Sequence, residues 1–86
     1  MANYRLKIKS SAEKELAKLP VRTIFVIRDD VKILATNPFP PGFKKLKGFK
    51  NMYRIRSGDY RIIYTLHQDI LVIEILKIAH RKDAYS

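Results

Sequence analysis

The chain has 86 residues and carries a formal net charge of +10 at pH 7, from 18 Lys and Arg against eight Asp and Glu. A chain of this length forms a single domain, residues 1–86, and its charge favours a polyanionic partner. It has no cysteine, which excludes disulfides and thiolate zinc sites, and His67 and His80 stand far apart in the sequence. We therefore expect no metal site and no cofactor.

Hydropathy favours a soluble protein. The sequence has no apolar run long enough to span a membrane and no signal-peptide layout. The first amphipathic segment is short and carries Glu13 and Glu15, which is unlike a basic helix that lies on a membrane surface. These features predict a cytoplasmic location and no membrane partner.

The first third of the chain has the pattern of a strand followed by two helices. Residues 3–9 alternate between apolar and basic side chains, which predicts a half-buried strand. Ser10 or Ser11 then offers an N-cap for a helix over residues 12–19.

A second helix is predicted to begin at Pro20 and to extend to about Thr36. So short a connection predicts that the two helices pack antiparallel. Residues 39–50 follow as a basic connecting loop, and we expect its apolar side chains to pack on the body of the domain. These side chains are Phe39, Phe43, Leu46 and Phe49.

Three further strands are predicted in the second half of the chain, and the last is apolar enough to be buried on both faces. They span residues 52–56, 60–67 and 70–78. The predicted class is therefore α+β, a strand and two helices followed by a three-stranded antiparallel meander. Both helices are expected on one face of a mainly antiparallel four-stranded sheet.

The first hairpin of the meander has two registers. A turn at residues 57–58 pairs Arg54 with Arg61, whereas a turn at residues 58–59 pairs Arg56 with Arg61. In either register the three arginines share the sheet face that is turned away from the core. Because directly opposed like charges destabilise a sheet by roughly 0.2–1 kcal/mol per pair, the cluster indicates an anionic ligand such as phosphate.

The last seven residues, HRKDAYS, are expected at the edge of the same face. His80 can exchange protons near neutral pH, and the ring of Tyr85 can stack on an unpaired base. With Arg81, and with Lys47 and Lys50 from the loop, these residues predict a site for RNA phosphates.

Three segments of the sequence, KKLKG, YRIRSGDYRIIY and the terminal HRKDAY, resemble the RelE/ParE toxin superfamily, and specifically its RelE-like ribosome-dependent mRNA interferases. The resemblance covers nearly the whole chain. It implies the toxin of a type II toxin–antitoxin system, which is neutralised by a cognate antitoxin. It also implies metal-free cleavage of mRNA in the ribosomal A site, where the ribose 2′-hydroxyl attacks the neighbouring phosphate.

Two alternatives to the nuclease remain open. ParE-type relatives share the fold and much of the YRIRSGDYRIIY pattern but inhibit DNA gyrase. A toxin-like protein without toxicity, which only binds RNA or is held by an antitoxin, is the third interpretation.

The resemblance also implies roles for particular residues. Arg54 and Arg56 stand where RelE-like enzymes have basic residues, often lysines, and Arg61 and Arg81 match arginines of the hairpin and of the C-terminal motif. Since a guanidinium group cannot be deprotonated, we expect the arginines to bind phosphate and to stabilise transition-state charge, and another group to move the proton. The predicted catalytic residues are Arg61, Arg81, His80 and Tyr85, and the predicted phosphate-binding residues are Arg54, Arg56, Lys47 and Lys50.

Overall fold

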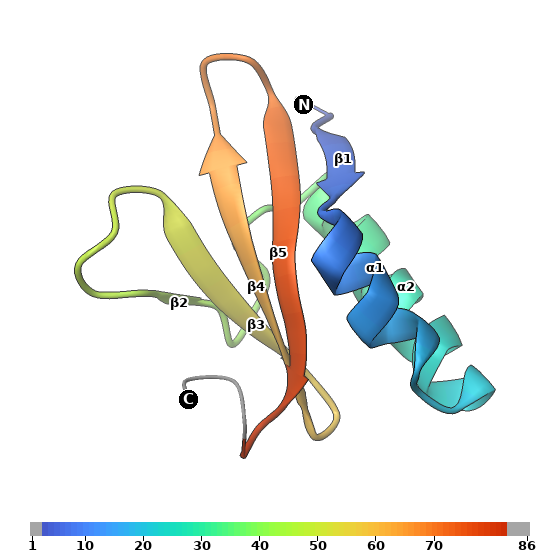
Figure 1. The fold of residues 1–86 in the computed structure, drawn as a ribbon. Coiled ribbons are helices and arrows are strands. Elements are labelled where there is room, and N and C mark those ends of the chain that lie inside the picture. The colour runs from blue at the N-terminus through green and yellow to red at the C-terminus, as the bar shows by residue number, and fades with distance from the viewer. Residues whose placement is uncertain (1–2, 83–86) are drawn as a thin grey trace.

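A computed structural model describes residues 3–82, which form a five-stranded sheet with two helices on one face (Figure 1). The elements are β1 (Arg5–Ile8), α1 (Ser10–Ala17), α2 (Val21–Leu34), β2 (Lys44–Lys45), β3 (Met52–Ser57), β4 (Tyr60–His67) and β5 (Val72–His80). The strand order is β1-β5-β4-β3-β2, and β1 is parallel to β5 whereas the other neighbours are antiparallel. The predicted α+β fold is confirmed, and the two-residue β2 adds a fifth strand.

The core lies between the helices and the inner sheet face. After β1, α1 runs along β5 and α2 turns back beside it (Figure 1), so that both helices bury an apolar stripe. Tyr64 is fully buried there, and its hydroxyl donates a 2.6 Å hydrogen bond to the Pro38 carbonyl. Burial, together with the nearby Tyr53, raises the pKa of Tyr64 well above its usual range. The buried core residues are Ala12, Leu16, Ile27, Val31, Leu34, Ile55, Ile62, Tyr64, Leu66, Ile73, Ile75 and Ile78.

The helix starts differ from the predicted caps. Lys9 precedes α1 and caps it without a side-chain hydrogen bond, so Ser10 lies inside the helix. The reason is that β1 leads directly into α1. The Lys9 N–H still donates to the Ile75 carbonyl of β5, while the Lys9 carbonyl already accepts from the Glu13 N–H. Pro20 likewise stands just before α2 rather than in its first turn.

Strand β5 contains a β-bulge, after which the inward and outward alternation of its side chains is reversed. Ile63 lies opposite Lys77 and Tyr64 lies opposite Ile75, so Leu76 is an extra residue between the two pairs. Beyond such a bulge the alternation of side chains is inverted. Ile78 therefore packs in the core, where its backbone N–H donates a 3.0 Å hydrogen bond to the Glu15 carboxylate of α1.

The loop between α2 and β3 packs only in part on the body. The rings of Phe39 and Phe43 contact Tyr53, with centroids 5.3 and 6.2 Å away, as expected. The expectation is wrong for Phe49, which is 55% exposed. In the part of the chain that the structure describes, no helix is long and apolar enough to cross a membrane.

Candidate nucleic-acid interface

The sheet face that the helices leave uncovered, here called the open face, carries the hairpin arginines. Strands β3 and β4 meet at a turn over Gly58 and Asp59, and Arg56 lies directly opposite Arg61. The second of the two predicted registers is therefore correct, and the turn at residues 57–58 is wrong. Gly58 has φ +59°, a left-handed conformation that favours glycine at this position of the turn.

Backbone hydrogen bonds hold Arg81 against this hairpin. The Arg81 N–H donates to the Asp59 carbonyl at 2.8 Å, and the Arg81 carbonyl accepts a 2.9 Å hydrogen bond from Nη1 of Arg61. A cavity of about 130 Å³, here called the arginine pocket, lies between these segments. It is lined by Arg56, Gly58, Asp59, Tyr60, Arg61 and Arg81. Three arginines and one aspartate thus line a small space.

Arg54 differs from the arginines of the pocket because it is buried. Its side chain is only 4% exposed, and among residues 3–82 its Nε and Nη1 have no hydrogen-bond partner. The prediction that it stands on the open face with Arg56 and Arg61 did not include this burial. Buried guanidinium donors that find no partner among residues 3–82 are unfavourable, so an anion that reached Arg54 would be stabilised by them.

Two lysines on the open face were not predicted. Lys44 of β2 lies directly opposite Arg54, and Lys77 of β5 lies opposite Ile63, which in turn lies opposite Arg54. Lys77 was missed because a strand predicted to be buried on both faces gives no sign of a bulge. The visible signal is that two charged residues, Glu74 and Lys77, interrupt the run ILVIEILKI.

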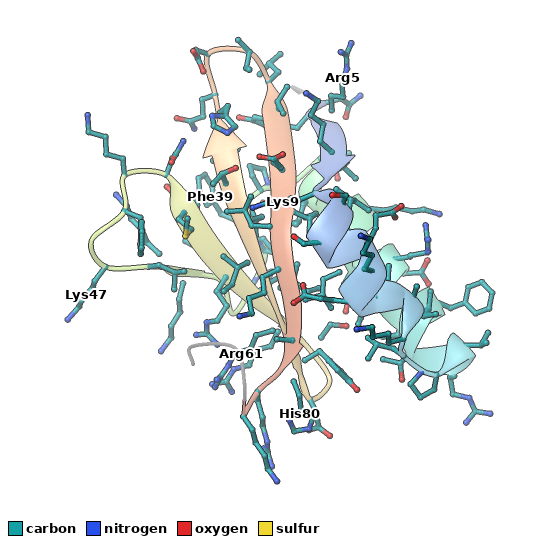
Figure 2. All side chains as sticks on the ribbon, viewed as in Figure 1. Arg5, Lys9, Phe39, Lys47, Arg61 and His80 are labelled. Carbon is teal, nitrogen blue, oxygen red and sulfur yellow. The ribbon has the colours of Figure 1, made fainter. Side chains whose placement is uncertain are left out.

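The structure does not place His80 among the arginines. His80 lies opposite Tyr60, and the two rings make an edge contact with centroids 5.5 Å apart, on the helix side of the sheet. Figure 2 shows Arg61 and His80 on the two sides of β5 at its C-terminal end. The Nδ1 atom of His80 accepts a hydrogen bond from the Lys82 N–H at 3.3 Å.

The predicted phosphate-binding residues Lys47 and Lys50 do not line the arginine pocket. Lys47 and Lys50 are exposed in the loop between β2 and β3, and Figure 2 shows Lys47 at the outer end of that loop. Tyr85 lies outside the described residues. Over residues 3–82, no three His, Asp or Glu side chains come together in a way that could hold a metal ion.

A small α+β domain with two helices on one face of a five-stranded sheet is a fold with known relatives. The family model described as ParE toxin of type II toxin–antitoxin system, parDE, matches residues 6–85. The chain therefore belongs to the RelE/ParE superfamily of type II toxins.

Individual relatives agree with this assignment. The Methanocaldococcus jannaschii protein named RelE1 is 33% identical over 96% of both chains, and toxin RelG of Mycobacterium tuberculosis is 26% identical over 95% of both. Among solved structures, the archaeal RelE–RelB complex from Pyrococcus horikoshii OT3 contains a chain that is 36% identical. The TM-score is 0.84, and the match covers 95% of this chain and 99% of that one.

Proposed function

We propose that this protein is a RelE-type toxin that cleaves mRNA on the ribosome. The observation that carries the proposal is the arginine pocket, in which Arg56, Arg61 and Arg81 surround a cavity of about 130 Å³. Guanidinium forks match phosphate oxygens in geometry and charge. The superfamily assignment adds the type II toxin class, and ribosome-bound mRNA as the substrate places the proposed action in the cytoplasm.

In the proposed reaction the ribose 2′-hydroxyl attacks the adjacent phosphorus, and the bond to the 5′-oxygen of the next nucleotide breaks. The products are a 2′,3′-cyclic phosphate and a 5′-hydroxyl end. Arg61 and Arg81 bind the non-bridging oxygens and stabilise the additional negative charge of the pentavalent transition state. Preorganised donors of this kind contribute about 10²–10³-fold each in rate.

The arginines cannot accept the proton of the 2′-hydroxyl, so another group must take it. Of the two groups suggested by the sequence, His80 makes an edge contact with Tyr60 at the helix side of the sheet, which makes it a poor candidate. Tyr85 remains a candidate through the family resemblance. Lys77 is a second candidate because it lies on the open face, in the strand next to Arg61.

The test is addition of the purified protein to a cell-free translation mixture, followed by mapping of mRNA 5′ ends. We expect cuts in phase with codons that appear only when ribosomes are present. Arg61→Ala and Arg81→Ala should each reduce cleavage by about 10²–10³-fold while the fold is retained. Arg28→Ala is the matched control, since Arg28 is an exposed arginine of α2 outside the arginine pocket. Full cleavage by both pocket variants would refute the proposed site.

We further propose a cognate antitoxin as the protein partner. The support is that the Pyrococcus horikoshii relative was solved as a RelE–RelB complex, and that a net charge of +10 suits an acidic partner. A complex with an antitoxin that covers the arginine pocket should block cleavage.

The second candidate function is inhibition of DNA gyrase, and one observation favours it: the family model that matches the chain is that of the ParE toxin. A gyrase supercoiling assay separates the two. Inhibited supercoiling with intact mRNA would support the ParE-type activity, and RNA binding without either effect would support the non-toxic relative.

A further inference from the structure

The loop between β2 and β3 forms a second basic element away from the arginine pocket. The Leu46 N–H donates a 2.9 Å hydrogen bond to the Met52 carbonyl, which closes a hairpin whose tip is the segment KGFKN. Gly48 has φ +85°, so the tip turns through a left-handed glycine. Residues 46–52, here called the hairpin tip, extend outward from the β2 edge of the sheet (Figure 1).

Phe49 is exposed at this tip. Its side chain is 55% exposed, whereas Phe39 and Phe43 of the same loop each pack against Tyr53. In residues 3–82 Phe49 makes no contact with another aromatic ring. The ring adds nothing to the buried core, so packing of the isolated fold does not explain it.

The charged residues that neighbour Phe49 in the sequence are all positive. Residues 39–58 contain six Lys and Arg and no Asp or Glu. Lys47 and Lys50 flank the phenyl ring in sequence and are exposed. Lys44 extends this group of positive charges to the open face, because it lies directly opposite Arg54. The six cations are Lys44, Lys45, Lys47, Lys50, Arg54 and Arg56.

We propose that the hairpin tip is a separate docking site for unpaired RNA. In this site Phe49 stacks on a base, and Lys47 and Lys50 bind the phosphates on either side of it. An exposed aromatic ring between cations is the combination that binds single-stranded nucleic acid. Phe49 is the one exposed large apolar side chain of the hairpin tip, and a single ring offers too little apolar area for a membrane or for a stable protein interface.

The choice of RNA as the ligand rests on the proposed function, but binding of RNA at the hairpin tip does not require cleavage. It changes the role expected for Lys47 and Lys50, from binding the scissile phosphate to holding RNA outside the arginine pocket. The probe is therefore a fluorescent single-stranded 2′-O-methyl RNA of 12 nucleotides, which lacks the attacking hydroxyl. Its affinity for the intact protein is measured by fluorescence anisotropy.

Phe49→Ala should weaken binding of this probe by about 5- to 140-fold, the loss that corresponds to removal of one base–aromatic stack. Phe49→Trp should keep the affinity, and Phe49→Leu, which keeps the apolar character without the ring face, should lose it. The matched control is Phe25→Ala, because Phe25 is 64% exposed on α2. We expect no change for this variant. Equal affinities of the Leu variant and the wild type would overturn the stacking.

The roles of Lys47 and Lys50 are tested by the salt dependence of the affinity for the RNA probe. Each phosphate contact to single-stranded RNA contributes about 0.7 to the slope of log K against log salt, so Lys47→Gln with Lys50→Gln should lower this slope by about 1.4. The control of equal charge is Lys14→Gln in α1 with Lys18→Gln just after α1, since both lysines are exposed. An equal reduction in both double variants would mean that only net charge matters and would overturn the site.

Two further experiments distinguish RNA from a lipid surface as the ligand, and distinguish RNA binding at the hairpin tip from cleavage at the arginine pocket. Vesicles of phosphatidylcholine and phosphatidylglycerol replace the RNA in one arm, and Phe49-dependent binding to vesicles alone would overturn the proposal. In the other arm, Arg61→Ala should bind the probe with Phe49-dependent affinity even though it does not cleave. If no variant or wild type cleaves mRNA, the proposed function fails, while the binding result still decides the hairpin tip.

Discussion

Replacement of Arg54 by methionine should make the protein more stable and less able to bind phosphate. Arg54 is 4% exposed, and within residues 3–82 two of its nitrogens lack hydrogen-bond partners. A buried unsatisfied donor costs about 1–3 kcal/mol, and Lys44 directly opposite adds roughly 0.2–1 kcal/mol of repulsion. Methionine keeps most of the apolar stem. We therefore expect the free energy of unfolding to rise by about 1–3 kcal/mol.

The assay is urea unfolding of both proteins, with and without inorganic phosphate. For a domain of this size each kcal/mol raises Tm by about 4–8 °C, so thermal unfolding gives an independent reading. Phosphate at ten times its Kd should stabilise the wild type by about 1.4 kcal/mol through binding to the folded state. Arg54→Met should gain less, because it lacks the buried cation that attracts the anion.

The matched control is Arg56→Met, two residues along the same strand. Arg56 is exposed, so its replacement should change the free energy of unfolding by no more than about 0.5 kcal/mol. If Arg54→Met is less stable than the wild type while the control is neutral, the buried guanidinium group makes net favourable contacts in the free protein, and the reasoning is refuted.

The other predictions concern proton transfer and the buried tyrosine. His80→Ala should keep the wild-type pH–rate profile of mRNA cleavage, and a changed profile would contradict this expectation. If Lys77 moves the proton, Lys77→Arg should lose cleavage, since guanidinium cannot be deprotonated. Full cleavage by Lys77→Arg would exclude Lys77 from this role. Tyr64→Phe should lower the free energy of unfolding by about 0.5–1.5 kcal/mol at pH 7, through loss of the hydrogen bond to the Pro38 carbonyl. The raised pKa of Tyr64 means that above about pH 10 the unfolded chain ionises this tyrosine first. Wild-type stability, measured by urea unfolding, should therefore fall there by more than that of Tyr64→Phe.

The sequence predicts the architecture well because its signals are local. Alternation over residues 3–9, helical spacing before Thr36 and a glycine turn before Tyr60 are each decided by neighbouring residues. The same reasoning finds the three arginines on one face. It misses β2, because two residues are too few to give a periodic pattern.

The candidate site is less predictable because it depends on pairing between strands. A one-residue choice of turn decides whether Arg54 or Arg56 lies opposite Arg61, and both turns are chemically acceptable. The burial of Arg54 depends on packing in three dimensions, which alternation alone does not report. His80 would lie on the open face if β5 alternated without interruption, and the bulge at Leu76 moves it to the other side.

The bulge in β5 has a broader consequence for how this fold can diverge. Because the bulge reverses the alternation of the residues that follow it, the surface offered to a ligand is set by the bulge as much as by the identity of the residues between Ile73 and His80. If the same residues alternated without a bulge, Ile78 would turn outward and Lys77 inward. Two proteins with the same residues along this strand, one with the bulge and one without it, would therefore present different chemistry to the same ligand.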